Sequence, residues 1–123
     1  MMAHSVYKLF HLLGIFMTFL SLGGLLLYAI NGGTKEQNTW RKPVAITHGV
    51  GVVLLLVSGF GMLARLGMFW PLPGWAIVKI VIWLILGGMT ALIYKGPDTG
   101  KTWWFIVLLL GLIAAYLATM KPF

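Results

Sequence analysis

Residues 9–30, LFHLLGIFMTFLSLGGLLLYAI, decide the fold, because this stretch holds no charged side chain over its whole length. About 20 apolar residues in an α-helix cross the roughly 30 Å of hydrocarbon in a bilayer. The stretch therefore predicts a membrane span from about residue 7 to residue 30. A cleaved signal peptide has an apolar region of only about 7–15 residues and a small-residue cleavage site, so we expect this span to be retained.

Three more apolar stretches follow, and they predict spans at about residues 44–67, 75–94 and 103–120. Short connections make consecutive spans antiparallel. We therefore expect an all-α integral membrane protein, an up-down-up-down four-helix bundle that forms a single transmembrane domain over residues 1–123. Both termini and the 68–74 loop lie on one side of this bundle, side A. The 31–42 and 95–102 loops lie on the other, side B.

Composition supports a membrane protein and narrows its chemistry. The chain has 123 residues and is 60% hydrophobic, with a mean hydropathy of +0.97, which is more apolar surface than a soluble domain of this size could bury. The absence of cysteine excludes disulfides, thiolate metal sites and thiol catalysis. The net charge of +7 comes from residues mainly at span ends, so it indicates contact with membrane lipids and not with nucleic acid.

The loops also predict an orientation. Five cations lie in the side B loops: Lys35, Arg41, Lys42, Lys95 and Lys101. Lys and Arg are enriched in cytoplasmic loops. We therefore expect side B in the cytoplasm of a bacterial inner membrane, with both termini in the periplasm.

Small and aromatic residues indicate how the helices pack and where the membrane surface lies. Helix contacts are expected at pairs of small residues: Gly87 with Ala91, Gly111 with Ala115, Ala114 with Ala118, and the Gly23-Gly24 patch. Five tryptophans fall at span ends, as aromatic belts require: Trp40, Trp70, Trp75, Trp103 and Trp104.

The ionisable residues inside the spans are all cationic or histidine: Lys8, His11, His48, Arg65 and Lys79. The two acids, Glu36 and Asp98, lie in loops. A charged residue within the hydrocarbon costs about 2.5–3.5 kcal/mol on insertion scales, so such residues often mark functional sites.

The two histidines are predicted to lie in opposite leaflets. His11 lies four residues into its span from side A, and His48 four residues into its span from side B. At 1.5 Å per residue this separates them by roughly 15–20 Å along the membrane normal. The two axial ligands of one iron lie within about 4–5 Å of each other, so both histidines of one chain cannot hold one haem iron.

Side A collects a layer of cations with no acid to neutralise them. Lys8, Arg65 and Lys79 lie there with His11, and Met62 and Tyr116 are at similar depth. In one interpretation the cations reach lipid phosphates, and His11 bonds a backbone carbonyl or Thr18.

In the other interpretation the same layer binds an anionic ligand between the helices. Haem b suits it, with its propionates at Arg65 and Lys79 and its iron on His11, and Met62 as the candidate second ligand. A quinone or an anionic lipid headgroup would fit the same pocket. For His48 the alternatives are a hydrogen bond between helices or a second ligand site near side B with Tyr28 or Thr90.

Three segments resemble a known group of proteins: Tyr7-Lys8-Leu9-Phe10-His11, then 41–63 with His48, then Trp75-Ala76-Ile77-Val78-Lys79. They resemble the small four-helix bacterial membrane proteins of the SirB type, within the wider CopD-like and HemJ-like group. The resemblance implies a four-helix inner-membrane protein without a settled activity. Its HemJ-like branch implies haem b and protoporphyrinogen oxidation, with Lys8, His11 and Lys79 as the matching positions, but the His-rich basic segment expected after the first span is replaced by 31–38.

Three functions remain open. The first is a non-catalytic accessory or assembly protein that pairs with itself or joins a larger membrane complex. The alternative is a haem b-binding, redox-associated membrane protein with His11 as axial ligand, and if it is an enzyme, it is a haem-dependent oxidoreductase. The third is a permease for a small solute or metal. A proton-coupled multidrug transporter is disfavoured, because no span contains an acid.

Overall fold

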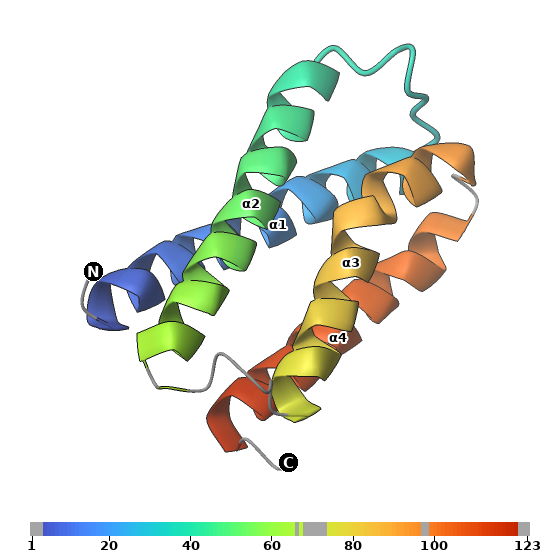
Figure 1. Ribbon diagram of the computed structural model, residues 1–123. Coiled ribbons are helices and arrows are strands. Elements are labelled where there is room, and N and C mark those ends of the chain that lie inside the picture. The colour runs from blue at the N-terminus through green and yellow to red at the C-terminus, as the bar shows by residue number, and fades with distance from the viewer. Residues whose placement is uncertain (1–3, 66, 68–73, 97–98, 121–123) are drawn as a thin grey trace.

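A computed structural model describes residues 4–65, 67, 74–96 and 99–120, and these residues form four α-helices without a strand. The helices are α1 (His4–Ile30), α2 (Arg41–Arg65), α3 (Gly74–Lys95) and α4 (Gly100–Met120) (Figure 1). Each is long and apolar enough to cross a membrane. The all-helical prediction is therefore confirmed.

The helix ends differ from the predicted spans by a few residues. α1 begins at His4, three residues before the predicted start, and α2 begins at Arg41, so Pro43 lies in the first turn. α2 ends at Arg65, and Gly67 has a positive φ of 72°. Such a backbone conformation ends a helix and favours glycine. The 68–74 loop, which we expect on side A, falls mostly outside the described residues.

The helix ends form two groups, which lie at opposite ends of the molecule. The first residues of α1 and α3 and the last residues of α2 and α4 lie at one end (Figure 1). The connection between α1 and α2 and the start of α4 lie at the other. We keep the names side A and side B for these two ends. The contact between α1 and α2 is by far the most extensive of the helix pairs.

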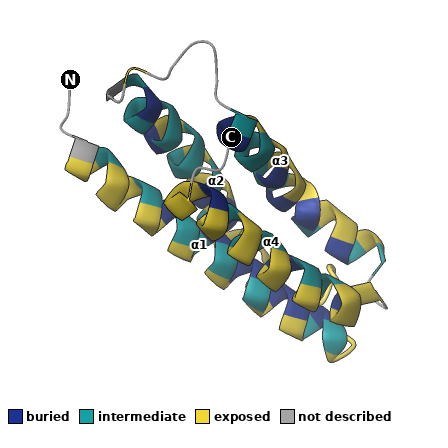
Figure 2. Cartoon of the chain, turned by 90° about the horizontal axis from the view of Figure 1, so that it is seen from below, coloured by how far each residue is buried: buried dark blue, intermediate teal, exposed yellow. Residues whose placement is uncertain are grey.

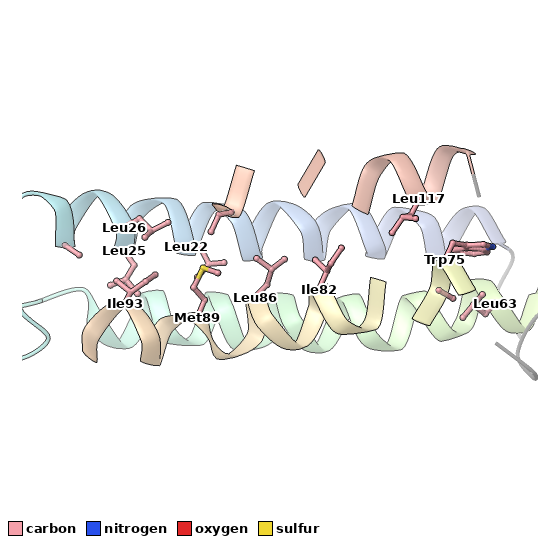
Figure 3. Close-up of a cluster of buried hydrophobic side chains, with 13 residues drawn as sticks. Leu22, Leu25, Leu26, Leu63, Trp75, Ile82, Leu86, Met89, Ile93 and Leu117 are labelled. Carbon is pink, nitrogen blue, oxygen red and sulfur yellow. The ribbon is translucent and has the colours of Figure 1, made fainter. Parts of the chain in front are cut away.

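The buried core lies mainly between α1 and α3. Leu22, Leu25 and Leu26 of α1 point toward Leu86, Met89 and Ile93 of α3 (Figure 3). Broad exposed faces lie on α1 and α4 (Figure 2), and all four helices carry exposed large apolar side chains, such as Leu20, at 74% exposure. Apolar surface on this scale is foreign to a soluble monomer and suits a hydrocarbon solvent.

Two glycines, Gly14 and Gly51, bring α1 and α2 together. A Cβ added to Gly14 would lie 2.9 Å from the Gly51 carbonyl oxygen. One added to Gly51 would lie 2.9 Å from the Thr18 nitrogen. The two backbones therefore touch at these positions, as small residues allow in membrane helices. We call the contact line between α1 and α2, from His11 and Ser58 to Ser21 and His48, the α1–α2 seam.

The predicted small-residue contacts have mixed outcomes. Gly111 does pack closely, against Phe19 of α1, and Gly87 packs against Val52 of α2. The Gly23-Gly24 prediction is wrong, because a Cβ at either position would meet nothing within 4 Å. Among the tryptophans, Trp75 is buried and Trp40 is 68% exposed, whereas Trp70 lies outside the described residues.

Candidate functional site

The strongest candidate site is the histidine at the side A end of the α1–α2 seam. His11 of α1 places its Nδ1 3.0 Å from the hydroxyl oxygen of Ser58 on α2. Ser58 is buried, and its hydroxyl also lies against the Leu54 carbonyl one turn earlier in α2. The predicted bond to a backbone carbonyl is present, because His11 forms a hydrogen bond with the Leu55 backbone, and Ser58 of the neighbouring helix takes the place of the predicted Thr18.

The hydrogen-bond inventory fixes the tautomer of His11. A serine hydroxyl has one proton, and Ser58 donates it to the Leu54 carbonyl. Its oxygen must then accept from His11, so Nδ1 carries the imidazole proton. In the tautomer that carries its proton on Nδ1, Nε2 of His11 has a lone pair. The ring thus presents a neutral nitrogen ligand.

A lysine from α3 approaches the same ring. The Lys79 ammonium lies close enough to His11 to interact with it electrostatically and is 6.0 Å from the centre of the Trp75 ring. The His11 ring also lies against Gly59, where an added Cβ would be 3.6 Å from Cε1. The site therefore joins His11, Ser58 and Lys79 from three helices.

The remaining predicted members of the side A layer are placed less closely. Lys8 is exposed near the start of α1, and Met62 is partly buried one turn after Ser58 on α2. Tyr116 is 52% exposed on α4. Arg65 ends α2, but its side chain lies outside the described part of the chain. Only His11 and Lys79 of the predicted ligand set are brought together by a described interaction.

His48, at the side B end of the seam, is a bridge between three helices. Its Nε2 lies 3.2 Å from the Gly87 carbonyl of α3, so this nitrogen donates. Its Nδ1 lies 3.4 Å from the hydroxyl of Ser21 on α1. The predicted partners Tyr28 and Thr90 make no described contact with it. The bond from Nε2 to the Gly87 carbonyl is the predicted hydrogen bond between helices, and Nδ1 lies against Ser21 of α1.

A repeated motif creates these two contacts, and the sequence analysis missed it. The pattern His-x2-Gly-x6-Ser occurs at 11, 14 and 21 and again at 48, 51 and 58. In an antiparallel pair, the histidine of each copy meets the serine of the other. Ten residues separate the two levels on each helix, about 15 Å at 1.5 Å per residue. Self-comparison of the spans would have revealed the motif.

The middle of the seam holds a buried hydroxyl. Thr18 is fully buried opposite Gly51, and within the described residues its Oγ1 has no hydrogen-bond partner. The Ser21 hydroxyl donates to the Thr18 carbonyl at 2.9 Å. The polar groups of the seam thus lie in separate levels without a continuous chain of hydrogen bonds between His11 and His48.

Two cavities lie away from His11. One of about 340 Å³ lies between the side B end of α1, the following connection and the start of α2. The other, of about 510 Å³, has an apolar lining from α1 and α4. In the described ranges no three His, Cys, Asp or Glu side chains lie close enough to hold a metal ion.

The comparisons with known proteins give no relative. No family model matches the chain, and no curated protein or solved structure is significantly similar to it.

Proposed function

We propose that this protein is a non-catalytic accessory protein of a bacterial inner membrane that binds haem b through Nε2 of His11. One observation carries the proposal: the Ser58 hydroxyl oxygen accepts a hydrogen bond from Nδ1–H of His11, which leaves Nε2 as a neutral nitrogen ligand inside an apolar helix. Haem-ligating histidines commonly bind through one nitrogen while the other donates to an oxygen.

The surroundings of His11 favour haem over a bare metal ion. A single imidazole cannot hold an ion that needs three or four protein ligands, whereas a porphyrin supplies four nitrogens of its own. Lys79 beside the ring offers a cation to a propionate. Met62, on the α2 face that carries Ser58, is the proposed second axial ligand, and Lys8 and Arg65 are proposed propionate partners. Bound haem would supply a one-electron redox centre.

An absorption spectrum tests the proposal directly. The protein is purified in mild detergent from haem-replete cells, and a Soret band is expected in the wild type and in His48→Ala. His11→Ala should lose the band, and Ser58→Ala should weaken it. Circular dichroism of each variant shows whether the helices are intact. A folded wild type without a chromophore under these conditions would sink the proposal.

Membrane topology is part of the same proposal. The four helices form an up-down-up-down bundle, with the side B loops in the cytoplasm and the termini in the periplasm. The excess of cations in the side B loops supports this orientation. Because the chain lacks cysteine, single-cysteine variants Ser5→Cys and Glu36→Cys can be labelled with an impermeant maleimide on intact cells with a permeable outer membrane. Labelling of Glu36→Cys but not of Ser5→Cys would show that the orientation is the opposite of the proposed one.

The accessory role has its own support in α4. This helix buries only Gly100, Val107 and Leu117 among the described residues and exposes a broad apolar face. That face could contact a second copy or a larger membrane complex, as the resemblance to SirB-type proteins leaves open. In-cell photo-crosslinking from position 109 tests it, with position 53 on the exposed face of α2 as the control. A chain that crosslinks to no protein from position 109 would count against an assembly role.

A further inference from the structure

The cavity at the side B end of α1 and α2 has the composition of a phospholipid site. Its floor is apolar, from Leu25 and Val44, and its rim is polar, from Gln37, Asn38 and Thr39. Aromatic walls come from two further residues, Tyr28 and Trp40. The volume of about 340 Å³ falls in the range of small-molecule sites, about 300–1,000 Å³.

The connection that forms the rim is held in place by side-chain hydrogen bonds. The Tyr28 hydroxyl donates to the Thr34 carbonyl at 2.8 Å. The Asn38 amide donates to the Tyr94 hydroxyl of α3 at 3.0 Å and accepts from the Trp40 nitrogen at 3.0 Å. These bonds fix the polar rim to α1 and α3, so the cavity is a built feature of the fold.

Exposed cations flank the cavity-lining residues in the sequence and outnumber the acids. Lys35, Arg41 and Lys42 lie on or just after the connection, and all three are exposed. The acid of this segment is Glu36, and no described cation forms a salt bridge with it. The segment therefore carries a net positive charge where the membrane surface is expected, which is complementary to a lipid phosphate.

We infer that this cavity binds one anionic glycerophospholipid. The phosphate lies at the exposed cations, the glycerol and ester groups at the amide and hydroxyl rim, and the upper acyl chains on the apolar floor beside Trp40. From the exposed cations through the polar rim to the floor, the site changes from charged to apolar. A phospholipid changes in the same order from its phosphate to its acyl chains. The site lies at the opposite end of the seam from His11, so a failure of lipid binding here can be distinguished from a failure of haem binding at His11.

Native mass spectrometry in detergent tests the inference with phosphatidylglycerol and phosphatidylcholine of equal chain length. We expect a one-to-one phosphatidylglycerol complex that forms more readily than the phosphatidylcholine complex. Replacing Arg41 and Lys42 by Gln should weaken phosphatidylglycerol about five-fold per charge, the effect of one cation near an anionic lipid. Lys101→Gln, a change in the other side B connection, should leave binding unchanged.

A filled cavity gives the second arm. Gly24 lines the cavity, and a Cβ there meets nothing within 4 Å, so Gly24→Leu should fill the cavity without a clash in the core. Gly88→Leu is the matched control, because Gly88 lies at similar depth on α3, is equally open and does not line the cavity. Trp40→Ala removes an exposed wall of the cavity, and it is the alternative test variant if Gly24→Leu fails to fold.

The outcomes are clear-cut. Loss of the phosphatidylglycerol complex in Gly24→Leu or Trp40→Ala, with retention in Gly88→Leu, supports the inference. Equal binding of the two lipids, or wild-type binding in Gly24→Leu, overturns it. Inorganic phosphate that displaces phosphatidylglycerol at equal concentration would also overturn it, since the site would then recognise the free anion.

Discussion

The two ends of the α1–α2 seam share a motif but differ in what α3 offers. At each end a histidine of one helix meets a serine of the other. At the side B end, the Gly87 carbonyl accepts the Nε2 proton of His48. At the side A end, α3 brings Lys79, a cation that cannot accept a hydrogen bond. The third helix therefore decides which histidine is structural and which keeps a free nitrogen.

Glycine explains why α3 can bond to His48. The Gly87 carbonyl lies in a helix, and its second lone pair can accept a proton from outside. Without a side chain at position 87, the imidazole can approach this carbonyl, and Val52 of α2 packs against the same residue. The difference between the two ends thus arises from one small residue and one lysine, eight positions apart on α3.

The largest effect is expected from a substitution that disrupts both ends of the α1–α2 seam at once. Gly51→Ala places a Cβ 2.9 Å from the Thr18 nitrogen and 2.8 Å from its hydroxyl, so α1 and α2 must separate. We expect the free energy of unfolding to fall by about 1–3 kcal/mol, measured by titration in mixed detergent micelles. Gly49→Ala, where a Cβ meets nothing within 4 Å, should be neutral or stabilising. Equal losses in both variants would contradict the close approach.

The next largest effect is a difference in unfolding free energy between alanine substitutions of the two histidines. His48→Ala removes a buried ring that contacts Ser21 of α1 and the Gly87 carbonyl of α3, whereas the hydrogen bonds of His11 join α1 to α2 alone. At about 0.6 kcal/mol per bond between membrane helices, each loss in unfolding free energy should be about 0.6–1.2 kcal/mol, and the loss for His48→Ala should be the larger because three helices meet at its ring. The same micelle titration measures both. A larger loss for His11→Ala would mean that its role in packing exceeds that of His48.

The four helices could be predicted from the sequence because hydrophobic length is a local property. The limits of a helix were less certain, as at the end of α2, where Gly67 was predicted inside the span but has the positive φ of a turn. The close approach at Gly14 and Gly51 could not be predicted, because a glycine forms such a contact only when another backbone lies opposite it. That information belongs to a pair of helices and not to either alone.

The site could be predicted only in part for a similar reason. The sequence predicts His11 and His48 at separate depths, and each histidine lies ten residues from a serine of its own helix, which contacts the other histidine. Which nitrogen of each histidine is free depends on the proton of a partner serine and on the Gly87 carbonyl, and neither can be known before the helices are packed.

A serine substitution tests the tautomers at the two ends. Ser58→Ala removes the serine oxygen that accepts from Nδ1–H of His11, which should cost about 1 kcal/mol and let the Nε2–H tautomer appear. Ser21→Ala should leave His48 as Nε2–H, because Gly87 still accepts from it. Nitrogen-15 NMR of histidine-labelled protein reads both tautomers. A wild-type His11 protonated at Nε2 would contradict the assignment.

The smallest expected effect concerns the second bond between α3 and α2. Trp83 donates its Nε1 proton to the Val52 carbonyl at 2.8 Å, close to the His48 end of the seam. Trp83→Phe removes this donor, but the carbonyl keeps its bond within α2, so the loss should be about 0.6 kcal/mol. In hydrogen exchange, amides of α2 near His48 should exchange faster while those near Ser58 stay unchanged. If both ends loosened equally, α3 would support the seam as a whole, and the contrast between its ends could not be assigned to Gly87 and Lys79.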